Sequence, residues 1–164
     1  DYAFYSDDYL ESIVIPASLE EIGKSAFNSC QELTEVVFEE DSSLTVIHSS
    51  AFNYTSLREF YIPESVAKIG SDAFSATDIR YIFIPANVLN CDGAFTDMEN
   101  ARSIEVSPEN PNYWSNSSGI VFSKDKSVLH FFPGDSSMTE YTVPAGTKHI
   151  AYAAFSGTNL KKLL

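Results

Sequence analysis

The dipeptide Ala-Phe recurs along the chain at nearly regular spacing, and this repeat constrains the fold more than any other feature. Its copies begin at residues 3, 26, 51, 73, 94 and 154. The first five are 23, 25, 22 and 21 residues apart, and the last gap is 60 residues. A repeat with a period in the range of about 20–29 residues predicts a solenoid in which each coil contributes one strand.

Two further markers keep a fixed phase with Ala-Phe. An apolar residue followed by proline precedes several copies, as at Ile15-Pro16 and Ile62-Pro63. Another apolar residue stands five positions before that pair and opens each unit. These opening residues are Leu10, Leu33, Leu57, Ile79, Ala101, Met138 and Leu160. Proline removes a backbone donor, so it predicts the end of each strand.

The third and fifth positions after each opening residue form two columns when the units are stacked. Their members are Ile13, Val36, Phe60, Ile82, Ile104, Tyr141 and Leu163, then Ile15, Phe38, Ile62, Ile84, Val106 and Val143. All of them are apolar or aromatic, and they alternate with other positions as in a strand. We therefore predict that these columns face a shared core. The neighbouring second and fourth positions then face solvent.

The other half of each unit is expected to turn its Ala-Phe pair inward as well. In the first full unit, Ala26, Phe27 and Cys30 fall on one face of a short helix if that segment is helical. Alanine is small enough to let neighbouring coils approach, and phenylalanine fills the space between them. We predict short helical or irregular segments opposite the strands.

The pattern Leu-x-x-Ile-x-Ile-Pro-x-Ser-Leu/Val-x-x-Ile-Gly-x-x-Ala-Phe, carried by residues 10–27 and 57–74, resembles the BspA-like leucine-rich repeat family. Cys30 matches a cysteine that is frequent three residues after Phe in this family. The resemblance implies an α/β solenoid of right-handed coils with one parallel strand per repeat of about 22–25 residues. It also implies a secreted or cell-surface protein, often bacterial, that binds other proteins or surfaces.

One unit, residues 101–137, is longer than the others. Two apolar runs flank five polar residues within it, which predicts a β-hairpin at about 119–132. We interpret this unit as an enlarged repeat and residues 1–164 as a single solenoid. Neither end shows a polar cap, so a fragment of a longer array is expected.

Composition excludes several classes of protein. With 10 Lys and Arg against 23 Asp and Glu, the formal net charge is −13, which argues against binding to nucleic acids or anionic lipids. No apolar run approaches the length of a membrane span. Cys30 and Cys91 should lie three coils, about 14 Å, apart, so we predict two reduced, buried thiols.

No catalytic or cofactor motif accompanies the repeat. The three histidines lie in different units without a neighbouring cysteine or a second histidine one helical turn away, so no metal site is expected. Phosphate-binding and hydrolase motifs are missing too. We predict a protein that is not an enzyme and that needs no cofactor.

The outward columns supply the candidate site. Val37, Tyr61, Tyr81 and Phe83 are predicted to form an exposed patch beside two acids, Glu35 and Glu59. Exposed aromatic residues often mark recognition surfaces, but cross-strand packing alone could also explain them.

Three functions remain open from the sequence. The first is an extracellular, adhesin-like module that binds a protein or glycan ligand on a host or neighbouring cell. The second is a spacer or stalk that presents another domain, and the third is an accessory region of a larger secreted enzyme.

Overall fold

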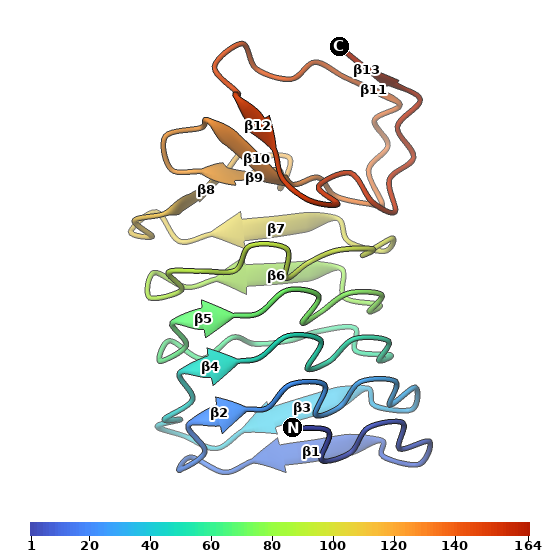
Figure 1. Ribbon diagram of the computed structural model, residues 1–164, viewed down its shortest axis with the longest axis vertical. Coiled ribbons are helices and arrows are strands. Elements are labelled where there is room, and N and C mark those ends of the chain that lie inside the picture. The colour runs from blue at the N-terminus through green and yellow to red at the C-terminus, as the bar shows by residue number, and fades with distance from the viewer.

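The chain winds into a stack of coils. The computed structural model describes residues 1–164 and shows a β-solenoid of about seven turns with about 22 residues per turn and no helix. The coils follow one another along the longest axis, from β1 near the N-terminus to β13 near the C-terminus (Figure 1). The repeat found in the sequence therefore sets the architecture. The right-handed winding that the resemblance implies stays a prediction.

Thirteen short strands build the coils. In the first five coils they are β1 (Ser12–Ile15), β2 (Glu21–Ile22), β3 (Glu35–Phe38), β4 (Val46–Ile47), β5 (Lys68–Ile69), β6 (Tyr81–Ile84) and β7 (Ser103–Val106). The later ones are β8 (Tyr113–Ser115), β9 (Val121–Ser123), β10 (Val128–Phe131), β11 (Glu140–Tyr141), β12 (His149–Ile150) and β13 (Lys162–Leu163).

One wall of the solenoid carries the strands that the repeat predicts. β1 pairs with β3, β6 with β7 and β11 with β13, all in parallel. On this wall the coil between β3 and β6 contributes no named strand, but a parallel bridge joins its Glu59 to Tyr81 of β6. Equivalent positions of successive units are thus neighbours, as the stacked columns required.

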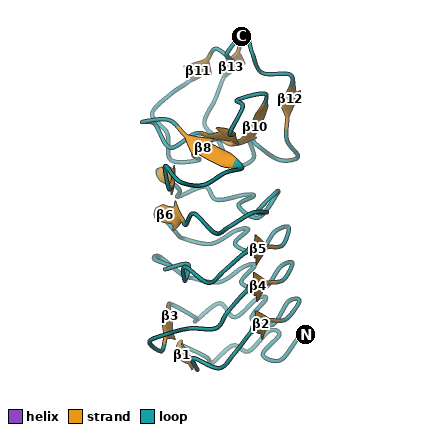
Figure 2. Cartoon of the chain, turned by 90° about the vertical axis from the view of Figure 1, so that its left-hand side faces the viewer, coloured by secondary structure: helices purple, strands orange, loops and turns teal.

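A second wall, which the sequence analysis did not foresee, carries β2, β4 and β5. These strands are also parallel, with Glu21 opposite Val46 and Val46 opposite Lys68. A bridge from Lys68 to Asn90 extends the ladder by one coil. Figure 2 shows this ladder on the side of the molecule away from β1, β3 and β6. Each regular coil therefore has a longer strand on one wall and a short one on the other.

The segments around Ala-Phe are turns, so of the two alternatives expected there, the helical one is wrong and the chain is irregular. The residue before Ala and the second residue after Phe have positive φ, for example 52° at Ser25 and 64° at Ser29. A right-handed helix cannot continue through such residues. The backbone N–H of Phe27 instead donates to Ala51 in the next coil at 2.8 Å. The same bond recurs in each regular coil, so the turns form a ladder of their own.

The predicted inward position of Ala-Phe is confirmed. Phe27, Phe52, Phe74 and Phe95 are buried and stack as a column with ring centroids 5.2–5.7 Å apart. They belong to a core cluster of 30 buried residues. In the first five coils the strand columns also face this core, whereas Tyr141 packs against a separate cluster around Phe132 and Leu163 is 46% exposed.

The enlarged unit departs from the regular coil after β7. Residues 119–132, where a hairpin was expected, hold β9 and β10, which pair antiparallel, and β8 pairs antiparallel with β9. β12 of the following coil pairs in parallel with β10. A second small core of five buried residues lies here, made of Ile120, Phe122, Leu129, Phe132 and Ala154.

Candidate binding face

The six residues of the candidate site line one open hollow on the outer face of the first wall. They are Glu35, Val37, Glu59, Tyr61, Tyr81 and Phe83. The side chains come from three consecutive coils. All six are exposed, so the structure places them together on the solvent side, where their positions in the repeat predicted them.

Strand alternation explains why such large apolar groups remain outside. In β6 the burial pattern alternates strictly, with Ile82 and Ile84 in the core and Tyr81 and Phe83 in solvent. The exposed fractions are 65% for Tyr61, 59% for Tyr81 and 46% for Phe83. Because the inner positions already supply the core, the outer rings are not needed to fill it.

The aromatic patch ends where the outward columns become polar. Along one column Tyr81 lies opposite Ser103, and along the other Phe83 lies opposite Glu105. At the opposite end Val37 continues to Val14, which is 60% exposed. The patch is therefore bounded along the solenoid axis rather than repeated in every coil.

Two residues of this hollow, Arg58 and Arg80, were missed by the sequence analysis. Each directly follows the opening residue of its unit, and both line the hollow beside the aromatic rings. The signal that could have found them is the 22-residue spacing, because both arginines occupy the same position of the repeat. Arg102 occupies the same position one coil later.

Arg102 differs from the other two arginines because it has a partner. Its Nε donates to Asp135 Oδ2 at 2.8 Å, and both side chains are about half exposed. The Asp135 carboxylate raises the pKa of Arg102, and the Tyr81 hydroxyl raises it to a smaller extent. Arg102 directly precedes β7, so the ion pair links the start of β7 to the far end of the enlarged unit.

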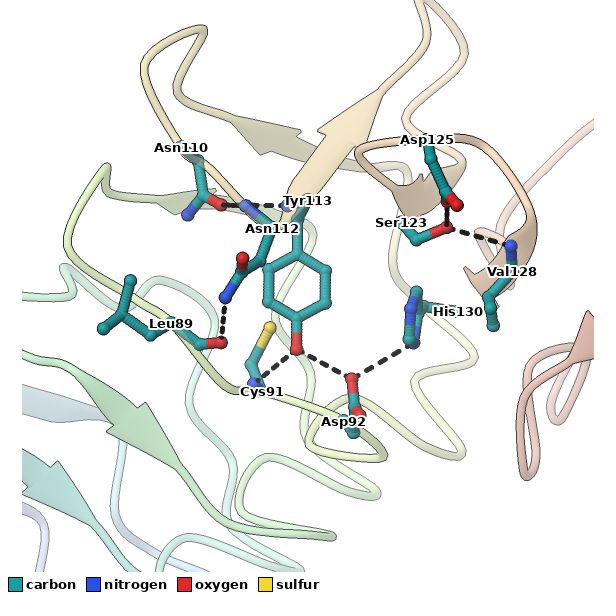
Figure 3. Close-up of polar contacts among 10 residues, drawn as sticks. All are labelled: Leu89, Cys91, Asp92, Asn110, Asn112, Tyr113, Ser123, Asp125, Val128 and His130. Atoms are coloured by element: carbon teal, nitrogen blue, oxygen red, sulfur yellow. Dashed lines mark hydrogen bonds and ion pairs between the residues drawn. The ribbon is translucent and has the colours of Figure 1, made fainter.

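Beyond this face, a polar cluster fastens the enlarged unit to the coil before it (Figure 3). The Tyr113 hydroxyl accepts a hydrogen bond from the Cys91 backbone N–H at 3.0 Å and donates to Asp92 Oδ1 at 2.7 Å. His130 Nδ1 lies 3.2 Å from the same carboxylate oxygen. The sequence analysis did not identify this cluster. Tyr113 follows Cys91 by 22 residues, which is the spacing of the repeat, but His130 follows Asp92 by 38 residues and is outside that spacing.

The cluster brings a cysteine, a histidine and an aspartate together in contacts that join the enlarged unit to the preceding coil. Burial raises the pKa of Cys91 to about 12, so its thiol stays protonated near neutral pH and cannot act as a thiolate nucleophile. Burial also lowers the pKa of His130, an effect that the Asp92 carboxylate partly offsets. The histidine ring packs edge-on against Tyr113.

The remaining predictions about chemistry concern cysteines, metals and membranes. Cys30 and Cys91 are both free and buried, as predicted. No group of three or more His, Cys, Asp or Glu side chains is arranged to hold a metal ion. The structure also contains no helix with the length and apolarity of a membrane span.

Comparison with known families defines this protein as a leucine-rich repeat solenoid. The chain belongs to the family described as the BspA type Leucine rich repeat region, which matches residues 1–118 in six copies. Modules of this class are typically non-catalytic, and they generally bind proteins. A search of curated proteins found no match.

Solved structures agree with this assignment. A leucine-rich repeat protein from Eubacterium ventriosum is 28% identical, with a TM-score of 0.91 over 99% of this chain and 43% of its own. The pneumococcal vaccine antigen PcpA is 25% identical, with a TM-score of 0.72 over 93% of this chain and 44% of its own.

A leucine rich cell surface protein from Faecalibacterium prausnitzii shares the fold, at 19% identity and a TM-score of 0.56 over 99% of this chain and 59% of its own. This chain thus spans less than half the length of the first two structures.

Proposed function

We propose that residues 1–164 form a non-catalytic interaction module of a secreted or cell-surface bacterial protein, and that the module binds its ligand through the face around Tyr61, Tyr81 and Phe83. The ligand is a protein or a glycan on a host or neighbouring cell, so the role is adhesin-like. Membership of the family and similarity to a vaccine antigen support the proposed location, secreted or on the cell surface.

One observation carries the choice of face. Four large apolar side chains, each at least 44% exposed, lie together over three coils although the core does not need them. Monomeric proteins rarely leave contiguous apolar surface of this kind without a partner. Tyrosine is also enriched among the residues that contribute most to binding at protein interfaces.

A spacer role is the second candidate, and the later coils favour it. The outward positions there are Ser103, Glu105, Glu140 and Thr142, a polar surface without aromatic residues. In that case Tyr61 and Phe83 only stabilise neighbouring strands by cross-strand packing.

The double variant Tyr61→Ala/Phe83→Ala separates the two candidates. Host extracellular material would be passed over the immobilised wild-type chain, this variant and a control, Tyr9→Ala/Tyr152→Ala, and the bound material would be quantified. Tyr9 and Tyr152 are 91% and 80% exposed and do not line the hollow, so the control removes two exposed aromatic rings that are not part of the face.

Binding through the face predicts that the face variant loses at least about tenfold in affinity while the control does not, as expected for interface anchors. A spacer predicts the reverse pattern for the face variant, namely lower thermal stability with unchanged binding.

A further inference from the structure

The three arginines of the chain form a single stack. Arg58, Arg80 and Arg102 are the only arginines among the 164 residues, and each takes the first position after the opening residue of its coil. Their backbones are joined directly, since the N–H of Arg80 donates to Arg58 at 3.4 Å and that of Arg102 to Arg80 at 2.8 Å. Neighbouring guanidinium groups therefore start from positions one coil apart, a step of about 4.8 Å.

Two members of this stack are left without a counter-charge. The ion pairs of the molecule are His48 with Glu21, Arg102 with Asp135 and His130 with Asp92. Arg58 and Arg80 are exposed in the hollow and have no carboxylate within ion-pair distance, although the chain carries 23 acids. Like charges on adjacent strands are unfavourable for stability, so stability does not account for this arrangement.

We infer that Arg58 and Arg80 bind carboxylates of an acidic protein segment that also carries apolar side chains and lies across the face. This inference rests on the proposed function, because it assigns the partner of the same hollow. A guanidinium group offers a planar fork of donors that fits a carboxylate with two hydrogen bonds. The exposed rings of Tyr61, Tyr81 and Phe83 then receive the apolar residues of the segment.

The acids of the hollow decide between a protein segment and a uniformly charged glycan. Glu35, Glu59 and Glu105 line the same hollow as the two arginines. A polysaccharide with a negative group on every unit would have to cross these carboxylates and be repelled by them. A polypeptide can place an acid at the arginines and an apolar or neutral residue elsewhere. Tyrosine and arginine are also the residue types enriched at protein interfaces.

A random peptide library displayed on phage, panned against immobilised residues 1–164, tests the inference. The inference predicts that selected peptides combine Asp or Glu with aromatic or aliphatic residues, and that panning against R58Q/R80Q loses the enrichment of acids. A selected peptide, labelled with fluorescein, would then be titrated by anisotropy. We expect R58Q/R80Q to weaken its binding at least about tenfold, and added salt to weaken the wild-type complex.

The matched control is K24Q/K68Q. It also removes two positive charges, at Lys68 in β5 and at Lys24 shortly after β2, and neither residue lines the hollow. Thermal melting would check that each variant is folded, and neither pair makes a side-chain ion pair that the variants would break. We expect the control to bind the peptide as the wild type does.

Three results would overturn the inference. They are a selection without acidic residues, equal binding by R58Q/R80Q and the wild type, and binding of heparin through the arginines without any acidic peptide. The Tyr61→Ala/Phe83→Ala variant distinguishes these failures from failure of the proposed face. If that variant loses the peptide while R58Q/R80Q keeps it, the face stands and the role of the arginines is wrong.

Discussion

The regular coils before residue 101 and the enlarged unit at residues 101–137 satisfy their backbone hydrogen-bonding groups in different ways. In the regular coils from Ala26 to Phe74, the backbone N–H of each Ala bonds within its own turn, and that of each Phe bonds to the Ala carbonyl of the next coil. The phenylalanine rings stack with interplanar angles of 6–9°. Each coil is thus stabilised by a neighbour of the same shape.

The enlarged unit has no neighbour of the same shape, so individual side chains replace the repeating contacts. Asn110 is fully buried, and its amide Nδ2 donates to the carbonyls of Pro85 and Val88, each at 2.9 Å. Its Oδ1 accepts from the N–H groups of Asn112 and Tyr113. Repetition lets the backbone satisfy itself, whereas an insertion needs polar residues at specific positions.

The largest expected effect is in the phenylalanine column. Phe74→Ala should lower the free energy of unfolding by about 3–5 kcal/mol, because the ring is fully buried and its removal leaves a cavity. Chemical denaturation would measure it. Phe4→Ala is the control, since Phe4 is 38% exposed and should cost clearly less. Equal loss at the two positions would mean that burial in the column does not determine stability.

The next largest effect concerns the hydrogen bonds that hold the enlarged unit to the preceding coil. Asn110→Ala should cost about 2–4 kcal/mol, because four backbone groups lose their partner in a buried place. Asn87→Ala removes one exposed bond to the Glu64 carbonyl and should cost less than about 1 kcal/mol. If both variants unfold at the same denaturant concentration, the enlarged unit does not depend on Asn110.

The smallest effect concerns the His130 ring in the same region. Its pKa should lie below the ordinary value of 6.5, and Asp92→Asn should lower it further by removing the one favourable charge. Since the unfolded chain takes up this proton at a higher pH than the folded chain, the free energy of unfolding should fall as the pH drops below 6.5.

Titration of His130 by NMR measures both pKa values. A His130 pKa above 6.5 in the wild type would show that the Asp92 carboxylate outweighs burial. An unchanged pKa in Asp92→Asn would show that the two groups do not interact.

The regular coils were predictable from the sequence, but the local conformation of Ala-Phe was not. Spacing alone placed Phe27 and Phe74 inside and Tyr81 and Phe83 outside, because strand alternation and stacking act at every period. The helix expected at Ala26 to Cys30 fails because positive φ at Ser25 and Ser29 lets the backbone bond to the next coil. Such bonds depend on the neighbouring coil, which a single unit does not reveal.

The residues of the candidate site were also only partly predictable from the sequence. Its six predicted residues could be found as columns, since they follow the period of the repeat, and the arginine stack follows it too. The contact of Asp92 with His130 could not be found, because His130 lies in the insertion, 38 residues after Asp92, outside the spacing of the repeat.

The sequence by itself determined the number and phase of the coils, their core and their outward columns, because a repeated pattern has one way to bury all its apolar positions together. Only the tertiary structure decided how the turns bond, how the enlarged unit is fastened and which arginine has a partner. Those features depend on contacts between residues of different coils, whose side chains meet at distances that the spacing does not encode.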